Sequence, residues 1–330
     1  MTDLHPLVHE ARRLADEVLF PRSLDTDTAG TAPTDLLDLL RDTGMYGIFS
    51  PTSVGGAGLA PQDRYLIQEA LAGACLTTAF VWQQHGGAAM AAATTDGPMS
   101  RYATPLATGA ARGGVAFAHL LRGGDPILVA EPEGDGWRFT GTAPFVTGWG
   151  TIDLVLTAAR HGEHIVWALL DGVTGPGMRA ERLHLAAIDS SDTYAVHYDQ
   201  HLVPAERVTS VVTFDDWYAG YRTGLRANGS LALGVAARCL RLLGPSALDG
   251  ELAAARNHLD TSCDDNMPEA RGRMGALCLR SAGALLARSG GAGVFLDQQA
   301  QRLGREALFL LVQGQTPEIK AVHLRQFGAS

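Results

Sequence analysis

Lysine is almost absent from this sequence, and acidic residues outnumber basic ones. Lys320 is the only lysine, and 26 basic residues face 35 acidic ones, which gives a formal net charge of −9 at pH 7. Such a charge disfavours nucleic acid and anionic membrane surfaces as general partners. We therefore expect no nucleic-acid partner and no membrane partner. The arginines are expected to act locally, because a guanidinium suits bidentate contact with phosphate or carboxylate groups.

Cysteine is also scarce, and signals for export are missing. The four cysteines, Cys75, Cys239, Cys263 and Cys278, are widely spaced, and no pair has the spacing of metal ligands. We expect reduced, mostly buried thiols and no metal site. Residues 1–6 have neither the basic nor the apolar segment of a signal peptide, and no apolar run is long enough to span a bilayer. These absences predict a cytoplasmic protein.

What the sequence does contain is an ordinary globular composition in three blocks. Its 330 residues are 46% hydrophobic and 18% charged, which is enough for a sizeable core. Apolar residues recur at helical spacing in the first block, short strand-like runs fill the second, and helical spacing returns from Phe214. We predict an N-terminal helical domain over 1–112, a β-domain over 113–212 and a C-terminal helical bundle over 213–330.

Turn and cap signals divide these blocks into elements. Pro61 opens a helix that reaches about Ala74, and a long helix stops at Gly244. A small, apolar helical segment over 77–93 contains Gln83, Gln84 and His85 in its middle, and these polar groups either face a ligand or form hydrogen bonds between helices. The strand-like runs are 136–141, 153–159, 164–170 and 193–203, and further helices are expected over 268–288, 298–313 and 316–326.

The segment Ala143-Pro144-Phe145-Val146-Thr147-Gly148-Trp149-Gly150 places one hydroxyl between two aromatic rings at a glycine-rich bend. Such a segment is suited to hold a flat conjugated ring, because the aromatics stack and the hydroxyl donates a hydrogen bond in plane. The alternative is a hairpin whose aromatics fill a β-core and whose glycines make the turn. These eight residues leave both interpretations open.

Several ordered motifs connect the chain to a known family. They are Gly44-Met45-Tyr46-Gly47-Ile48-Phe49-Ser50-Pro51 followed by Gly55-Gly56, Phe145-Val146-Thr147, Val203-Pro204-Ala205-Glu206-Arg207-Val208, and Gly290-Gly291-Ala292-Gly293 with Arg302 and Arg305 beyond it. With its order of helices, β-domain and helical bundle, the chain resembles the acyl-CoA dehydrogenase family over nearly its full length. The resemblance implies a multidomain α+β fold that is mostly α, with an N-terminal helical domain, a middle β-barrel domain and a C-terminal helical bundle.

The resemblance also implies where a cofactor binds. In that family FAD lies between the β-domain and the bundle, and oligomerisation completes the site, so a homodimer or homotetramer is expected here. Thr147 would hydrogen-bond the flavin near N5, and Phe145 would pack against the isoalloxazine. The predicted cofactor-binding residues are Phe145, Thr147, Gly148, Trp149, Arg226, Gly290 and Gly291.

Glycine and arginine have separate roles in this prediction. Gly290 and Gly291 would bring backbone amides close to the phosphate or adenine end of a partner subunit's FAD, because no Cβ blocks the approach. Arg226 or Arg222 would contact the pyrophosphate, or would lie on a solvated helix face.

Elsewhere the chain departs from the family. Where the family carries Thr-Glu-Pro-x-x-Gly-Ser-Asp, which lines flavin and thioester, this chain reads Ala116-Phe117-Ala118-His119-Leu120-Leu121-Arg122-Gly123-Gly124-Asp125. His119 and Arg122 are the candidates for substrate contact there, although His119 equally suits a structural histidine. The family's Arg-x-x-Phe-Gly motif, which reaches a neighbour's FAD, is absent after Gly244.

The family's catalytic glutamate is missing as well. Removing the α-proton of an acyl thioester requires a carboxylate within hydrogen-bond reach. In the family this glutamate lies in the loop after the penultimate helix, where Gly314 stands here, or early in the long helix, where this chain reads Thr223-Gly224-Leu225-Arg226. An amide cannot accept the proton at useful pH. The catalytic residue is left open, and the candidates are Gln313, Glu318, Asp216 and the Asp189/Asp192 pair.

Three functional hypotheses follow. The first is an FAD-dependent oxidoreductase of the acyl-CoA dehydrogenase type that performs α,β-dehydrogenation of an acyl thioester or a related metabolite. The second is a flavin-dependent monooxygenase on the same fold, which needs no such base. The third is a non-redox scaffold or a partner subunit of a heteromeric dehydrogenase.

Overall fold

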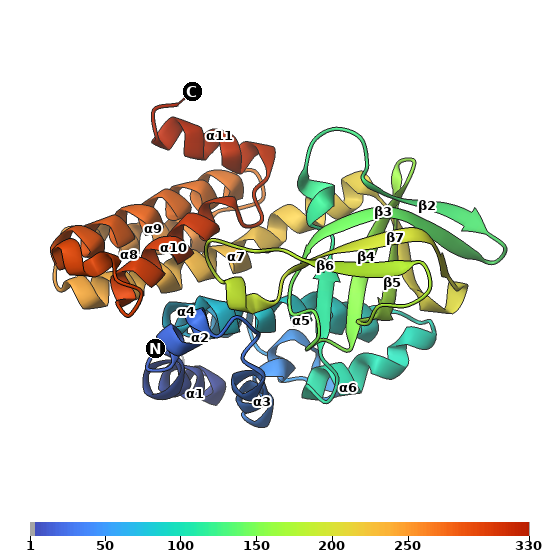
Figure 1. Cartoon of the computed structure of the whole chain (residues 1–330), viewed down its shortest axis with the longest axis horizontal. Helices are drawn as coiled ribbons and strands as arrows, with labels where there is room; N and C mark the ends of the chain where they lie inside the picture. Colours follow the sequence, from blue (N-terminus) through green and yellow to red (C-terminus); the bar gives the residue numbers. More distant parts are fainter. Residues whose placement is uncertain (1–3, 330) are drawn as a thin grey trace.

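The structure, a computed structural model, describes residues 4–329. Figure 1 shows a β-sheet at one end of the molecule, the C-terminal helices at the other, and the N-terminal helices below both. Residues 1–3 of the N-terminal stretch considered above lie outside the described part of the chain. Across residues 4–329, every helix is too short or too polar to cross a bilayer.

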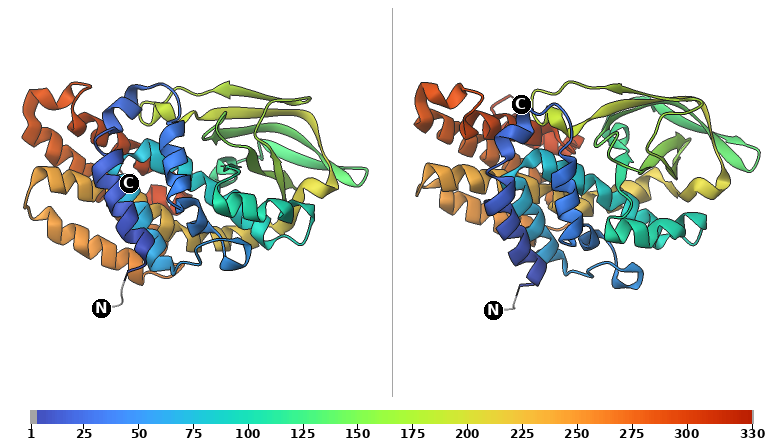
Figure 2. Two further views of the ribbon diagram at one scale, coloured as in Figure 1. Left: turned by 90° about the horizontal axis from the view of Figure 1, so that it is seen from below. Right: turned by 60° about the horizontal axis from the view of Figure 1, so that its bottom comes forward.

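Helices fill the first third of the chain because its apolar residues repeat with the helical period. They are α1 (Pro6–Leu14), α2 (Ser23–Thr28), α3 (Thr34–Asp42), α4 (Pro61–Ala74), α5 (Leu76–Thr94) and α6 (Ala103–Thr108), with short π or 3-10 turns between some of them. Pro61 begins α4 and Ala74 ends it, as predicted. α5 lies at the centre of the molecule, where it contacts α4, α6 and the first strand (Figure 2).

The middle of the chain consists of strands. They are β1 (Gly113–Ala116), β2 (Leu128–Glu133), β3 (Gly136–Val146), β4 (Leu154–His161), β5 (His164–Asp171), β6 (Met178–Arg182), β7 (Tyr194–Val203) and β8 (Val208–Thr213). Within residues 4–329 these eight strands form one sheet in the order β6-β7-β3-β2-β4-β5-β8, and β1 pairs with β4. One face of β4 and β5 packs on the helices and the other on the core of the β-domain, so both strands are almost continuously apolar.

The last third is a helical bundle. Its helices are α7 (Phe214–Leu243), α8 (Leu248–Thr261), α9 (Met267–Ser289), α10 (Gln299–Val312) and α11 (Pro317–Gln326). α7 runs from the sheet into the bundle and packs along both α4 and α9, so it links all three parts of the chain (Figure 1). The predicted fold, mostly α with a β-domain between two helical parts, is confirmed.

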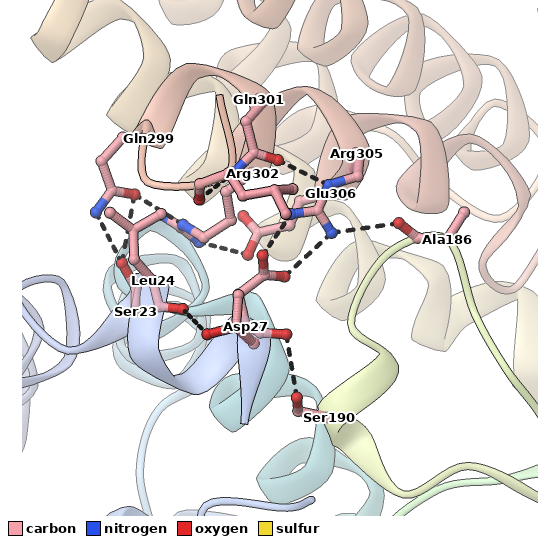
Figure 3. Close-up of polar contacts among 12 residues, drawn as sticks. Ser23, Leu24, Asp27, Ala186, Ser190, Gln299, Gln301, Arg302, Arg305 and Glu306 are labelled. Carbon is pink, nitrogen blue, oxygen red and sulfur yellow. Dashed lines mark hydrogen bonds and ion pairs between the residues drawn. The ribbon is translucent and has the colours of Figure 1, made fainter. Parts of the chain in front are cut away.

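A polar joint ties the three parts together. In Figure 3, α2, α10 and the loop before β7 meet at Asp27, whose carboxylate pairs with Arg305 of α10. The backbone carbonyl of Asp27 accepts a hydrogen bond from the Ser190 hydroxyl at 3.1 Å, and Arg305 donates to the carbonyl of Ala186 at 3.3 Å. These contacts fix the β-domain loop against both helical parts.

Candidate active site

Phe145, near the end of β3, projects from the protein surface. The pairing of β3 with β7 loses register between Ala143 and Val146, and Phe145 takes a φ of 59° in this irregularity. A positive φ strains a residue that has a Cβ. The Phe145 side chain is 57% exposed. An exposed aromatic ring on a strained backbone is typical of a ligand contact.

The residues after Phe145 are buried. Thr147 is 3% exposed, and its hydroxyl lies 3.0 Å from the hydroxyl of Thr193. Trp149 packs into the core of the β-domain, and its backbone N–H donates to the carbonyl of Asp192. Of the three side chains, only Phe145 is therefore exposed. To donate a hydrogen bond to a flavin, the Thr147 hydroxyl would have to turn away from Thr193. The flavin contact of Thr147 stays a prediction.

The bend after β3 is not a hairpin. β3 pairs with β2 and β7, whereas β4 pairs with β1, β2 and β5. Gly148 has a φ of 81°, and its N–H donates to the carbonyl of Ser191 at 3.0 Å. The hairpin interpretation is therefore wrong in its strand pairing, although it correctly places an aromatic ring, that of Trp149, in the β-core.

Gly290 and Gly291 lie exposed at the end of α9. Gly290 has φ 61° and ψ −155°, a conformation that is essentially restricted to glycine. A Cβ on either residue would meet no atom within 4 Å. The backbone at this point is therefore open to close approach by a phosphate group or a flat ring of another molecule.

The two arginines considered for the pyrophosphate are engaged within the chain. Arg226 is buried, and its Nε and Nη2 contact Asp260 at 2.8 and 2.6 Å while Nη1 donates to Ser230 at 2.8 Å. Arg222 donates to the carbonyl of Asp264 at 3.0 Å. A phosphate contact by Arg226 requires loss of its pairing with Asp260 and stays a prediction.

His119 and Arg122 have different environments. His119 is buried, with Nε2 3.0 Å from the carbonyl of Ala158. Burial lowers the pKa of His119 to about 4, against the opposing effect of that hydrogen bond, so its ring is neutral at neutral pH. Nδ1 has no hydrogen-bond partner in the described structure. Arg122 is exposed in the loop that follows. Contact of either residue with substrate stays a prediction.

The turn between α10 and α11 places Gly314 against α7. Gly314 has a φ of 60°, and its carbonyl accepts a hydrogen bond from the Tyr221 hydroxyl at 3.3 Å. A Cβ on Gly314 would lie 3.0 Å from Tyr221 Oη and 3.1 Å from Asn228 Nδ2. Asn228 in turn accepts from Gln83 of α5 at 3.2 Å, which confirms the helix-to-helix interpretation for Gln83. The polar groups nearest the Cβ position of Gly314 are therefore neutral.

An aromatic cluster, Phe117, Trp167, Trp217 and Tyr221, joins the β-domain to the start of α7. The ring centroids of Trp217 and Tyr221 are 5.4 Å apart, and Phe117 lies 5.9 to 6.0 Å from the other three rings. The sequence did not predict this cluster. The signal was present in the spacing of Trp217 and Tyr221, four residues apart on one helix face.

The carboxylates proposed as bases have structural contacts. Glu318 is exposed and accepts a hydrogen bond from the Tyr218 hydroxyl at 2.9 Å. Partial burial acts to raise the pKa of Glu318. Hydrogen bonds, including those from Thr316 and Tyr218, outweigh this effect, so the pKa is lowered. A carboxylate with a lowered pKa is a weaker base. Asp216 accepts from Thr213 at 2.6 Å at the start of α7.

The other candidates for the catalytic base are Asp189, Asp192 and Gln313, and the two aspartates have structural contacts. Asp189 accepts from the backbone N–H of Leu185, and Asp192 from that of Ala32, both at 2.7 Å. These contacts fix the loop before β7. Gln313, beside Gly314, has a buried side-chain oxygen without a partner in the described structure.

Three buried histidines predict a loss of stability in acid. Burial lowers the pKa of His85, His119 and His323 to about 4, whereas a histidine in an unfolded chain titrates near pH 6.5. Because the folded-state pKa is depressed, the stabilisation is complete above about pH 6.5 and is lost as the pH falls toward 4. His85 alone should contribute a slope of about 1.4 kcal/mol per pH unit in this window.

Denaturant unfolding between pH 7.5 and 4.5 measures this dependence. His85 bridges the N–H of Gly113 and the carbonyl of Leu106, so His85→Gln should reduce stability at pH 7.5 but make its pH dependence shallower. An unchanged slope in this variant would show that His85 does not titrate on unfolding.

Comparison with known proteins identifies the fold of the chain and the family of its N-terminal region. Residues 2–110 match the family described as acyl-CoA dehydrogenase, N-terminal domain. The whole chain superposes on butyryl-CoA dehydrogenase from Megasphaera elsdenii with a TM-score of 0.83 and 18% identity over 99% of both chains. A glutaryl-CoA dehydrogenase from Mycobacterium smegmatis in complex with FADH2 gives a TM-score of 0.82 and 17% identity over 98% of this chain and 92% of that one.

Part of the chain is similar in sequence to curated proteins. A 3-sulfinopropanoyl-CoA desulfinase from Advenella mimigardefordensis is 26% identical over 247 residues, which are 69% of this chain and 61% of the relative. A desulfinase of the same name from Paraburkholderia xenovorans is 25% identical over 70% of this chain and 63% of the relative. The aligned regions thus span less than two thirds of these two curated relatives.

These findings establish the fold of the chain and the family match of its first third. Its architecture is that of the acyl-CoA dehydrogenases along the entire described chain. Residues 2–110 match the N-terminal domain of the acyl-CoA dehydrogenase family.

Proposed function

We propose that this chain is an FAD-dependent enzyme that acts on an acyl thioester without proton removal by a carboxylate at the α10–α11 turn. The observation that carries the proposal is the neutral environment of Gly314, against Tyr221 and Asn228. Amides cannot accept an α-proton at neutral pH, and burial raises the pKa of Tyr221, which keeps its hydroxyl protonated. α,β-Dehydrogenation, which the resemblance implied, needs a base from elsewhere.

Two surface features support FAD as the cofactor. Phe145 offers an exposed ring, and Gly290 with Gly291 offers backbone that a ligand can approach closely. FAD, when bound, would supply a two-electron acceptor. Beside the glycines, Val294, Phe295 and Leu296 are exposed, which suits burial against a second copy of the chain. A homodimer or homotetramer in which each copy supplies its glycines to a neighbour's FAD is therefore part of the proposal.

A second candidate reaction is the release of a sulfinate group from an acyl-CoA. The relatives named as 3-sulfinopropanoyl-CoA desulfinases favour it. In this reaction the C–S bond is replaced by a C–H bond, and water supplies the hydrogen and the third oxygen of the hydrogensulfite that leaves. No net oxidation occurs, so the reaction is compatible with a site that has no carboxylate beside Gly314.

The test compares two thioesters on FAD-supplemented protein without oxygen. Butanoyl-CoA, the substrate type of a dehydrogenase, should bind without bleaching the flavin within minutes. Addition of 3-sulfinopropanoyl-CoA, with sulfite measured in the same sample, tests the second candidate. Rapid bleaching by butanoyl-CoA would contradict the proposal, because it requires an effective base. Oxygen consumption by the chemically reduced protein would instead support a monooxygenase.

Phe145→Ala should reduce flavin retention without affecting the fold. The side chain is exposed, and alanine keeps the Cβ that phenylalanine has at this positive φ, so the melting temperature should change little. We expect FAD to dissociate several-fold more readily, as measured by the flavin recovered after gel filtration. The matched control is Leu202→Ala, another exposed apolar side chain of the β-domain. Equal retention in both variants would exclude Phe145 from the flavin site.

A further inference from the structure

A cavity of about 280 Å³ lies between α4, α7 and the N-terminal helix α1 with the turn that follows it. Part of its wall consists of small residues, because α4 and α7 touch there through their backbones: Ala15, Ala70, Gly73, Gly234 and Ala237. Five charged side chains also line it: Arg12, Asp16, Glu69, Arg238 and Arg241. The residues that line this cavity are different from the candidates for flavin and substrate contact.

The turn after α1 is a π-helix, Ala15–Leu19. The N–H of Phe20 donates to the carbonyl of Ala15, five residues earlier, at 3.0 Å. π-Helical turns are rare and recur at functional sites. Ala15 and Asp16, the first two residues of this turn, line the cavity. The unusual turn therefore helps to form the cavity wall.

Two guanidinium groups of α7 share the carboxylate of Asp16. Nη2 of Arg238 lies 2.6 Å from Oδ1, and Nη1 of Arg241 lies 2.8 Å from each oxygen. Arg238 is 8% exposed, and it is held further by the Gly73 carbonyl, which accepts from Nε at 2.9 Å, and by the ring of Phe20 at 4.3 Å. These contacts leave Nη1 of Arg238 and Nε and Nη2 of Arg241 as donors for a ligand.

The charges around the cavity do not balance. One carboxylate, that of Asp16, faces two arginines, and the other, that of Glu69, binds Arg256 through both oxygens. Arg12 is exposed and forms no ion pair within residues 4–329, and the nearest glutamates along its helix pair with Arg13 instead. Four arginines against two carboxylates leave a surplus of two positive charges at the cavity.

A second cavity, of about 430 Å³, adjoins the first, because Ala237 and Arg241 line both. One carboxylate lines it, that of Asp249, which accepts a hydrogen bond from the N–H of Ser246 at 2.7 Å. The rest of its lining is uncharged: Leu240, Gly244, Pro245 and Leu252. A molecule with an anionic end and an apolar or flat body can therefore occupy the two cavities together.

We propose that the two cavities form a binding site for a phosphomonoester, whose phosphate lies among Arg12, Arg238 and Arg241 and whose organic body extends into the second cavity. Near neutral pH a phosphomonoester carries close to two negative charges, which matches the surplus. Guanidinium groups suit phosphate because their planar donors match its oxygens in pairs. The site is separate from the candidate active site, so the inference goes beyond the proposed function and does not depend on it.

Isothermal titration calorimetry of the FAD-supplemented protein at pH 7.5 tests the inference, with AMP as the probe and adenosine as the matched ligand without phosphate. AMP is expected to bind about tenfold more tightly than adenosine or better, because charge-assisted hydrogen bonds form only with the phosphate. Coenzyme A also carries a phosphomonoester. Arginine-dependent binding that is tighter for coenzyme A than for AMP would assign the site to the nucleotide end of a thioester, and the reverse order would assign it to a free metabolite.

Variants of α1 and α7 locate the binding. Arg12→Gln should weaken AMP about tenfold without lowering the melting temperature of the ligand-free protein, because no ion pair is lost. Arg241→Gln should weaken AMP similarly. Arg13→Gln is the control, because Arg13 is the next residue of α1, pairs with Glu10 and Glu17, and lies outside the cavity lining.

Two results would overturn the inference. One is AMP that binds no more tightly than adenosine, and the other is an AMP affinity that Arg12→Gln and Arg241→Gln leave unchanged. A protein that takes up no FAD but binds AMP through Arg12 would contradict the proposed function and leave this inference standing.

Discussion

Replacing Arg302 by methionine is expected to lower the free energy of unfolding by about 3–5 kcal/mol. Arg302, on α10, is buried and pairs with Glu306 one turn later, which is also buried (Figure 3). Arg302 also donates to Gln299 at 2.8 Å and to the carbonyl of Ala74 at 3.3 Å. Burial raises the pKa of Glu306 and Arg302 opposes this. Without the arginine, a buried carboxylate must remain charged without a partner or take up a proton.

Urea unfolding of a double-mutant cycle measures this pair. Glu306→Leu combined with Arg302→Met should be less destabilised than Arg302→Met alone, because no charge is left buried. Arg13→Met is the control, since Arg13 forms ion pairs on the exposed face of α1 and its loss should have a much smaller effect. Equal destabilisation by Arg302→Met and Arg13→Met would show that the buried pair does not stabilise the junction of the three parts.

Gly234→Ala should destabilise the protein by about 3 kcal/mol or more, because it separates two helix backbones. A Cβ on Gly234 of α7 would lie 2.2 Å from the carbonyl oxygen of Glu69 and 2.8 Å from the backbone nitrogen of Gly73, both on α4. A Cβ on Gly73 would lie 2.5 Å from the carbonyl oxygen of Gly234. Backbone atoms cannot move aside as a flexible side chain can, so α4 and α7 must move apart.

The control for this prediction lies on the same helix. Gly220, also on α7, has no atom within 4 Å of its Cβ position. Gly220→Ala should therefore stabilise the protein by about 0.5–1 kcal/mol, the usual difference between these residues in an exposed helix. The two substitutions are chemically identical, so opposite signs in thermal or urea unfolding isolate the contact between α4 and α7. A neutral Gly234→Ala would mean that the helices do not approach this closely.

The sequence predicted the elements that have strong local signals. α4 has Pro61 in its first turn and an apolar run that ends at Ala74, so both ends were predictable. α8, Leu248–Thr261, was not predicted, because it packs at the surface and only Leu259 in it is buried, which leaves no clear apolar face. The predicted strand 136–141 continues to Val146 through its pairing with β7, a long-range contact that local spacing does not encode.

The candidate site also divides into residues with a local sequence signal and contacts that form only in the fold. Phe145 and Gly290 were singled out because they lie in short motifs that resemble the family, and the structure shows both residues exposed. Their roles in binding a cofactor stay predictions. The contact between Thr147 and Thr193 was not predicted, because it joins residues 46 positions apart. Nothing local distinguishes Arg12 from the arginine that follows it. Its place beside a cavity appears only when α4 and α7 are packed together with α1.

The flavin content of the purified protein tests the central claim most directly. The protein is incubated with FAD, excess cofactor is removed, and the visible spectrum is recorded together with the protein concentration. An FAD-dependent enzyme of this fold should retain flavin in stoichiometric amount, with the absorption bands of a bound isoalloxazine. A colourless protein that takes up no FAD would contradict the claim and would indicate a scaffold that has kept the fold of the family without its redox chemistry.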